Sequence, residues 1–189
     1  MKKIGALFTD LMETVIISLS IFLVVYLFFM QPHQVNGQSM VPNFQNGDYV
    51  LTDKISYRLG SPQRGEVIVF HAPPAANCVE GTGCDFIKRV LALPGETVAV
   101  RDGKIFVNDR ALPEDYLPSD LKTNPGPFTQ NGPITLGADE YLAVGDNRSH
   151  SSDSRFWGPI HRSDIVGKAF FRYWPPGSIG AIVAASYSF

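Results

Sequence analysis

The strongest constraint on this chain is an apolar run near its N-terminus. Residues 14–30 carry no charge, and the wider segment 11–30 contains a single charged residue, Glu13, near one edge. An α-helix needs roughly 20 apolar residues to cross the hydrocarbon core of a membrane, so this segment can cross once. It is apolar on every face, whereas a helix that packs on a protein core has one apolar stripe. We therefore predict a transmembrane helix at 11–30.

A cleavable secretion signal is the main alternative for this run. Such signals have an apolar core of about 7–15 residues, followed by a cleavage site of small residues. The run in this chain is longer, and the sequence QPHQ at 31–34 offers no such site. These two differences favour an uncleaved anchor.

Basic residues predict the orientation of the anchor. Lys2 and Lys3 precede it, and the next Lys or Arg is Lys54. Because Lys and Arg concentrate on the cytoplasmic side, we expect residues 1–10 in the cytoplasm and residues 31–189 on the other side of the membrane. The formal net charge of −2 argues against a nucleic-acid-binding surface.

Short apolar runs follow the anchor, without long helical periodicity. The dipeptide at 102–103, Asp-Gly between two β-type runs, is a strong hairpin signal. Residues 112–137 are rich in Pro, Gly, Asn and Asp, and we expect an irregular insert or lid there. The pattern predicts a mainly β domain with an antiparallel, barrel-like arrangement. The expected strands are 49–52, 67–70, 86–93, 98–101, 104–108, 141–144 and 165–173.

The chain has two cysteines, Cys78 and Cys84. In a translocated domain the default for such a close pair is a disulfide, with free thiols as the alternative. Two cysteines alone make a poor zinc site, and no second pair of ligands accompanies them. We therefore predict a disulfide and no metal site.

Ser39 is the candidate nucleophile, nine residues beyond the apolar run in the sequence GQSMVP at 37–42. A serine hydroxyl at that position would work at the membrane surface, but it is a weak nucleophile until a base removes its proton. The sequence lacks the second Gly of the Gly-x-Ser-x-Gly elbow, because Val41 stands there. A turn serine before Pro42 is the structural alternative.

Lys88 is the candidate base. Strand alternation places it on the same face as Phe86 and Val90, with Arg89 on the opposite face. An amine among apolar side chains is desolvated, which lowers its pKa and allows it to accept a proton. A lysine at the edge of a sheet, with its amine in solvent, is the alternative.

The densest polar segment is 145–155, GDNRSHSSDSR. Asp153 and Arg155 would project from the same face of an extended strand, so we expect an ion pair between them. His150 lies between two aspartates, so a Ser-His-Asp triad is conceivable. We interpret it and the other three histidines as exposed loop residues. A serine of this segment could instead hold the Lys88 amine toward Ser39.

Taken together, these segments resemble type I signal peptidases, the membrane-bound serine-lysine endopeptidases. The chain contains four of that family's sequence boxes in the family's order, behind an N-terminal anchor. The sequence RYWPP at 172–176 and the short loops look most like the cyanobacterial and plastid-thylakoid branch. The boxes are SMVP at 39–42, RGEVIVF at 64–70, KRVLALPGE at 88–96 and GDNRSHSSDSR at 145–155.

The resemblance implies a role for each matched residue. Ser39 corresponds to the nucleophile, Lys88 to the general base and Ser151 to the serine that orients the lysine amine. The backbone N–H of Ser39 corresponds to one oxyanion donor. Gly37 stands where some relatives supply a second donor, so that donor is unassigned. The implied structural ion pairs are Asp153–Arg155 and Asp146–Arg89.

The resemblance also implies the substrate and the setting. The expected substrate is an extended signal peptide with small side chains before the cut, as in Ala-x-Ala sites. The implied partners are exported preproteins, the lipid bilayer and the export machinery, in the plasma (inner) membrane or the thylakoid membrane, without a cofactor. The expected pocket walls, for which core packing is the alternative, are Val35, Met40, Phe44, Val69 and Ile87.

Two other functions fit parts of the sequence. A self-cleaving repressor-type protease shares the serine-lysine chemistry, but it carries a DNA-binding domain where this chain has an anchor. A catalytically silent, membrane-tethered module that binds exported chains would need neither Ser39 nor Lys88.

Overall fold

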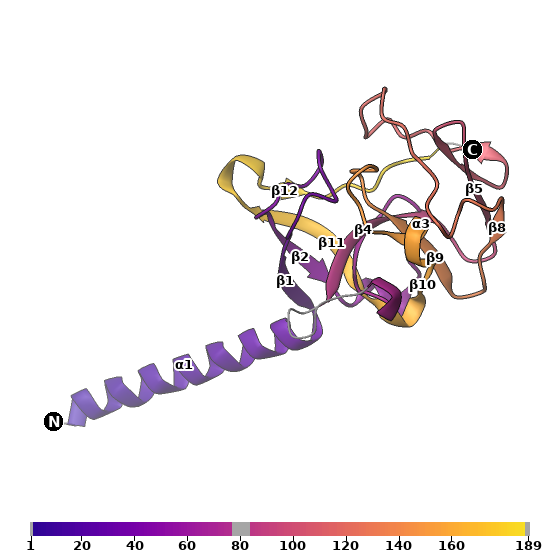
Figure 1. Cartoon of the computed structure of the whole chain (residues 1–189). Helices are drawn as coiled ribbons and strands as arrows, with labels where there is room; N and C mark the ends of the chain where they lie inside the picture. Colours follow the sequence, from indigo (N-terminus) through magenta and orange to yellow (C-terminus); the bar gives the residue numbers. More distant parts are fainter. Residues whose placement is uncertain (1, 77–83, 188–189) are drawn as a thin grey trace.

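The computed structural model describes residues 2–76 and 84–187. Helix α1 (Lys2–Phe28) projects from a β-rich body that contains the rest of the described chain (Figure 1). It is the one described helix that is long and apolar enough to cross a membrane, at Thr9–Tyr26, and none of that window is buried against the protein. Leu19 and Phe22 are each 62 % exposed, so the apolar surface of α1 faces away from the protein's own core. The helix begins before the predicted segment 11–30 and ends two residues earlier, because the chain turns into a strand at Met30.

An open antiparallel sheet forms most of the body. Its strand order is β1-β2-β11-β3-β4-β9-β10, with β12 pairing with β11 as well. Strand β11, late in the sequence, is inserted between β2 and β3, and it pairs with both. The eight strands are β1 (Met30–Gln34), β2 (Tyr49–Asp53), β3 (Val67–His71), β4 (Asp85–Ala92), β9 (Glu140–Val144), β10 (Ile160–His161), β11 (Ile165–Trp174) and β12 (Gly180–Ala181).

A second, four-stranded sheet has the order β7-β6-β5-β8. It contains the predicted hairpin, in which Asp102 and Gly103 both have positive φ, at 53° and 74°. The predicted insert 112–137 includes β8, and Leu112 and Leu136 at its ends are buried in the adjoining core. The strands are β5 (Thr97–Arg101), β6 (Lys104–Val107), β7 (Arg110–Ala111) and β8 (Ile134–Thr135).

Short helices connect these strands, and none of them forms a layer over the sheets. They are α2 (Ser56–Leu59), η1 (Pro74–Ala76), α3 (Ser154–Trp157), η2 (Arg162–Asp164) and η3 (Pro176–Ser178). The mainly β, antiparallel prediction is confirmed. The larger sheet has the form of an open half-barrel, because β1 and β10 end it without pairing with each other.

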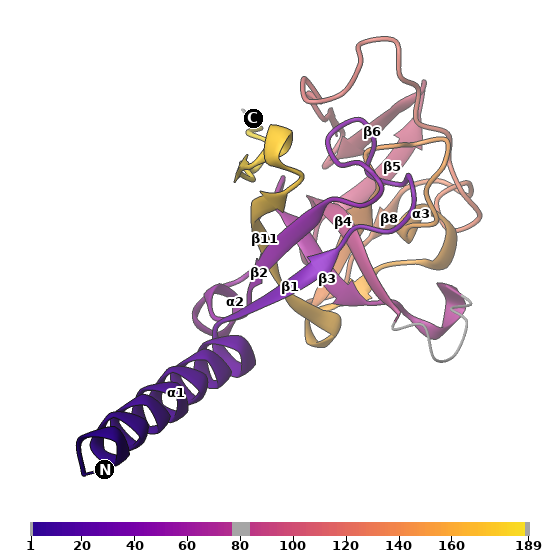
Figure 2. The same cartoon turned by 90° about the vertical axis from the view of Figure 1, so that its left-hand side faces the viewer.

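The C-terminal segment crosses the body after β11. Figure 1 shows it running from β11 toward the smaller sheet, and Figure 2 shows its end above β11 in the view. Its backbone is fixed along the way, since Ile182 N donates to Phe170 O at 2.8 Å and Ala185 N donates to Gly65 O at 3.1 Å. The ring of Tyr187 then packs against the core of the smaller sheet.

Candidate active site

The loop between β1 and β2 carries Ser39. Its apolar side chains point into the core below, where Met40 and Phe44 are buried. A second loop, after β9, holds it from the other side: Asn147 N donates to Ser39 O at 2.9 Å, and Asn147 Nδ2 donates to Gln38 O at 3.0 Å. Ser39 itself remains half-buried. The two loops therefore fix the backbone of Ser39 and leave its side chain at the surface of a cavity.

Lys88 reaches Ser39 from the middle of β4. Its Nζ donates to Ser39 Oγ at 2.8 Å and to Ile87 O at 3.0 Å, and it lies 5.0 Å from the centre of the Phe86 ring. The lysine is only 4 % exposed. Burial lowers the pKa of Lys88 from 10.5 to about 8, although the charges of Asp153 and Asp146 act to raise it. About a tenth of this amine is therefore neutral at pH 7, compared with well under a thousandth of a lysine amine at the ordinary pKa of 10.5.

Arg89, the next residue of β4, points to the opposite side and forms a buried ion pair. Its Nε and Nη2 donate to the two carboxylate oxygens of Asp146 at 2.9 and 2.7 Å, and its Nη1 donates to Gly65 O. Asp146 also accepts from Asn43 Nδ2 at 2.8 Å. The pair thus ties β4 to both the loop that carries Ser39 and the loop after β9.

Asp153 and Arg155 form a second buried ion pair, but not in the predicted way. We expected an extended strand, whereas Asp153 is the N-cap of α3 and Arg155 lies within that helix. Asp153 accepts from the backbone and the side chain of Arg155, with Nη2 to Oδ2 at 2.8 Å. The strand interpretation was wrong, because capping requires the carboxylate to fold back onto the first turn. Asp153 also accepts from Gly145 N, which fixes the end of β9.

Ser151 is buried next to Gly145. Its Oγ has no hydrogen-bond partner within the described structure, so the expected bond to Lys88 is not formed. A Cβ on Gly145 would lie 2.2 Å from Ser151 Oγ and 2.5 Å from Ser39 O. The absence of a side chain at 145 therefore allows the loop with Ser151 to approach the loop that carries Ser39.

A cavity of about 350 Å³ opens beside Ser39 and Lys88. Three of the five expected pocket residues, Val35, Val69 and Ile87, line it. The other two, Met40 and Phe44, lie in the core cluster that also contains Val35. The structure therefore places them beneath the cavity rather than in its wall.

Two titratable residues of this cavity were not expected, His33 and Asp85. The interpretation of all histidines as exposed loop residues was wrong for His33, which lies in β1 with only 14 % of its side chain exposed. His71 and His161 are exposed, as expected, but they end strands β3 and β10 and do not lie in loops. Strand alternation could have indicated Asp85, since it lies two residues before Ile87 on the same face of β4. His150 Nδ1 lies 2.9 Å from Ser149 Oγ, and the side chain that contacts Ser39 Oγ is that of Lys88.

Arg148 is a third residue that the sequence did not single out. It is buried and binds Glu114 through both terminal nitrogens, and its Nη1 also donates to Thr123 Oγ1 at 2.6 Å. Glu114 and Thr123 belong to the insert 112–137. The insert is thus attached to the loop that contains Ser151.

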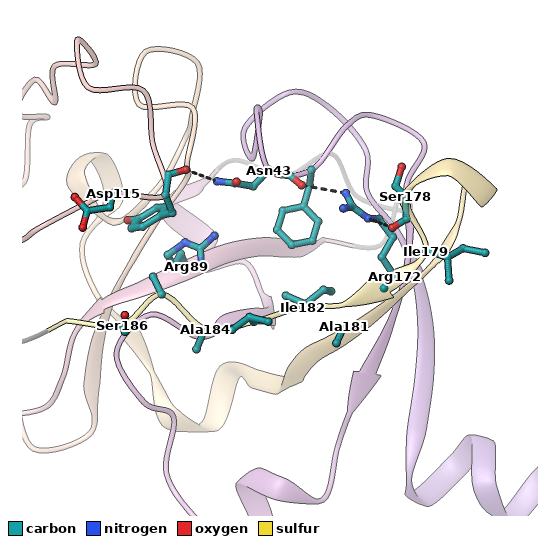
Figure 3. A pocket seen from close by; sticks show the side chains of 15 residues that line it. Asn43, Arg89, Asp115, Arg172, Ser178, Ile179, Ala181, Ile182, Ala184 and Ser186 are labelled. Atoms are coloured by element: carbon teal, nitrogen blue, oxygen red, sulfur yellow. Dashed lines mark hydrogen bonds between the residues drawn. The ribbon is translucent and has the colours of Figure 1, made fainter.

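A larger cavity, of about 600 Å³, is lined on one side by residues 178–186 of the C-terminal segment (Figure 3). Asn43, Arg89 and Arg172 face it, and neither Ser39 nor Lys88 lines it. Asn43 Nδ2 donates to Tyr116 O, and Arg172 Nη1 donates to Asn43 O and to Asp48 Oδ2. The polar groups of its wall therefore bind one another and support the loop that carries Ser39.

The predicted disulfide lies partly outside the described residues, because Cys78 falls in the segment 77–83. The pairing of Cys78 with Cys84 therefore stays a prediction.

Comparison with known proteins identifies the family. The model of the family described as "Signal peptidase, peptidase S26" matches residues 8–174. A "Signal peptidase I" of Leptolyngbya laminosa is 37 % identical over 171 residues, which cover 90 % of this chain and 81 % of that protein. A "Probable signal peptidase I-2" of Synechocystis sp. is 35 % identical, with 92 % and 76 % covered.

A plant protein is similar to this chain as well. The "Thylakoidal processing peptidase 1, chloroplastic" of Arabidopsis thaliana is 36 % identical over 79 % of this chain and 43 % of its own length. The family match spans most of the chain, and the cyanobacterial relatives are covered over most of their length. The chain therefore belongs to the peptidase S26 family of type I signal peptidases, with cyanobacterial and plastid affinity.

Proposed function

We propose that this membrane signal peptidase cuts exported preproteins after a small residue, with Ser39 as nucleophile and Lys88 as general base. The observation that carries the proposal is the 2.8 Å contact between a buried lysine amine and a half-buried serine hydroxyl. A neutral amine within hydrogen-bond distance of a hydroxyl is the arrangement that base catalysis requires.

The reaction follows from these positions. Lys88 Nζ takes the proton of Ser39 Oγ as the oxygen attacks the carbonyl carbon of the scissile bond. The backbone N–H of Ser39 donates to the resulting oxyanion, and the Lys88 ammonium returns its proton to the leaving amine. Water, deprotonated by Lys88, then attacks the acyl-enzyme. The bond to Ser39 Oγ breaks as the Lys88 ammonium returns its proton to that oxygen, and the new carboxyl end is released. Ser151 is assigned to orient the amine, which requires its Oγ to rotate toward Lys88.

The shape of the site supports the proposal that the substrate binds as an extended peptide. Residues 85–88 of β4 pair with β3 on one side, and on the other side β4 pairs with β9 only from Arg89 onward. A peptide can therefore add as a strand along the remaining edge. Val35, Val69 and Ile87 offer a shallow apolar surface that suits small side chains. Met40 and Phe44 support this wall from the core.

We assign the topology from the basic residues and the helix. Residues 1–10 lie in the cytoplasm, 11–30 span the bilayer, and 31–189 form the catalytic domain on the non-cytoplasmic side, with 112–137 as an insert. This domain meets preproteins as they leave the export machinery, in the plasma or thylakoid membrane. A preprotein still held by its signal segment would present the scissile bond close to Ser39, which follows the anchor by few residues.

The test is cleavage of a labelled preprotein by the purified full-length chain in detergent. Ser39→Ala and Lys88→Ala should each reduce the rate to background, because each removes one member of the proton transfer. Lys104→Ala is the matched control, since it removes a strand lysine whose side chain is exposed. Thermal unfolding of each variant shows that the domain is still folded.

Two other results of this cleavage assay would contradict the proposal. Turnover retained in a folded Ser39→Ala or Lys88→Ala variant would refute the serine-lysine pair. A wild-type chain that binds the preprotein without cutting it would instead support the silent binding module.

A further inference from the structure

A basic surface lies next to the end of α1. The chain passes from α1 into β1 through one residue, Phe29, whose carbonyl oxygen accepts from Lys54 N at 3.0 Å. Helix α2 begins two residues after Lys54, and Figure 2 shows it close to the end of α1. Phe29 lies about 5 Å beyond the apolar window that ends at Tyr26, at 1.5 Å per residue. When α1 crosses a bilayer, Lys54 and α2 are therefore held at the level of the lipid headgroups.

Three cations and no carboxylate line a cavity of about 220 Å³ on this surface. Arg162 is fixed in its wall, because its Nη2 donates to Tyr57 O and its guanidinium lies 5.4 Å from the centre of the Tyr57 ring. Arg58 is exposed. None of the ion pairs among the described residues includes Arg58 or Arg162. The lining residues are Lys54, Tyr57, Arg58, Arg162, Ile165 and Val166.

The carboxylates around this cavity bind other groups. Asp53 accepts from two backbone N–H groups at the start of α2, at 2.7 and 3.1 Å. Glu66 accepts from Lys168 Nζ and from Tyr57 OH, each at 2.7 Å. Asp164 accepts from a backbone N–H at 3.0 Å. The two arginines of the cavity therefore keep their charge available for an anion from outside the chain.

An apolar side chain stands beside these cations. Leu59, at the end of α2, is 87 % exposed and follows Arg58 directly. An exposed leucine alone is ordinary. Next to basic residues and at the end of a membrane helix, however, it matches an interfacial anchor, in which the apolar side chain enters the lipid and the cations stay among the headgroups.

We propose that the surface formed by Lys54, Arg58, Leu59 and Arg162 binds the headgroup of an anionic lipid in the leaflet next to the catalytic domain. The cations hold the negatively charged headgroup, and Leu59 enters the acyl region beside it. Because one residue joins α1 to β1, this second attachment fixes the tilt of the β-rich body against the membrane. The inference does not depend on the chemistry of Ser39 and needs only that α1 spans a bilayer.

The experiment places a photoreactive side chain on this surface. The full-length chain with Leu59→p-benzoylphenylalanine is reconstituted into nanodiscs that contain equal amounts of phosphatidylglycerol and phosphatidylcholine. After irradiation, mass spectrometry compares the two lipid adducts within one sample. The phosphatidylglycerol adduct should be at least about fivefold more abundant, the factor expected for one cation beside an anionic surface. Adding Arg58→Gln should lower this ratio about fivefold.

Two controls separate the surface from the rest of the chain. Arg110→Gln removes the charge of an exposed arginine in the smaller sheet, and it should leave the adduct ratio unchanged. Phe22→p-benzoylphenylalanine places the photoreactive group on α1, where Phe22 is 62 % exposed. It should give both lipid adducts in nearly equal amounts, which shows that α1 is inserted.

The other outcomes would overturn the lipid site. Lipid adducts at position 22 but none at position 59 would mean that α2 does not reach the membrane. Equal adducts at position 59, or a preference that survives Arg58→Gln, would remove the role of the cations. Equal adducts together with a melting temperature that rises with inorganic phosphate would mean that the cavity takes a free anion instead. Cleavage by Ser39 and Lys88 is tested separately by the preprotein assay, so failure of the lipid site leaves the proposed function standing.

Discussion

At the scale of single residues, the proposed role of Lys88 as general base couples activity to pH. Its amine must be neutral to accept the serine proton, and its pKa is lowered to about 8. Below that value kcat/KM should fall about tenfold for each pH unit, and above it the rate should level off. The measurement is a pH profile with a fluorogenic peptide that contains no titrating side chain. A flat profile from pH 6 to 8 would contradict the assignment of Lys88 as base.

The same pKa has a consequence for stability. The unfolded chain holds the Lys88 proton up to about pH 10.5, whereas the folded chain releases it near pH 8. Between these values the unfolded state binds more protons, so stability contributed by this site rises with pH. Lys88→Met should therefore raise the free energy of unfolding at pH 7, by at most about 3 kcal/mol, and the gain should shrink toward pH 10. Urea unfolding at both pH values tests this, with exposed Lys104→Met expected to show no gain.

At the scale of elements, the loop 145–155 depends on its buried charges. Asp153 is fully buried, and its carboxylate accepts hydrogen bonds from the Arg155 side chain and from a backbone N–H at the N-terminus of α3. Asp153→Asn leaves the Arg155 charge buried without its counterion, which should cost about 3–5 kcal/mol of unfolding free energy. Asp109→Asn breaks an ion pair with Arg101 in which Asp109 is 85 % exposed, and it should change stability little. Equal effects in chemical denaturation would show that burial does not set the value of these pairs.

At the scale of the whole molecule, the C-terminal segment connects distant parts of the fold. Gly65 allows the C-terminal segment to pass close to the backbone at residue 65. Its φ is +89°, and a Cβ there would lie 2.0 Å from Ala185 O. Gly65→Ala should therefore combine backbone strain, about 1–3 kcal/mol, with displacement of residues near 185. Gly47→Ala is the matched control, because its φ is +91° and nothing lies within 4 Å of the added Cβ. Thermal unfolding should show a clearly larger loss for Gly65→Ala, and equal losses would mean that the segment contributes nothing to stability.

The sequence by itself determined the features that depend on residues close together in the chain. The apolar length of 14–30 gave the exposed helix, alternation in β4 separated Lys88 from Arg89, and Asp-Gly at 102–103 gave the hairpin. Each of these rests on a local period or a local φ preference. The four boxes in order gave the family, but they carried no distance between Ser39 and Lys88.

Only the tertiary structure decided which distant residues meet. Ser39 and Lys88 are 49 positions apart, and their contact depends on a sheet in which β11 lies between β2 and β3. The same sheet brings His33 of β1 to Asp85 of β4, which no local pattern indicated. Asp153 and Arg155 are close in sequence, yet the fold made them a helix cap instead of a strand pair. Burial decided that case, because buried backbone and guanidinium donors need partners, and the carboxylate in this conformation satisfies both.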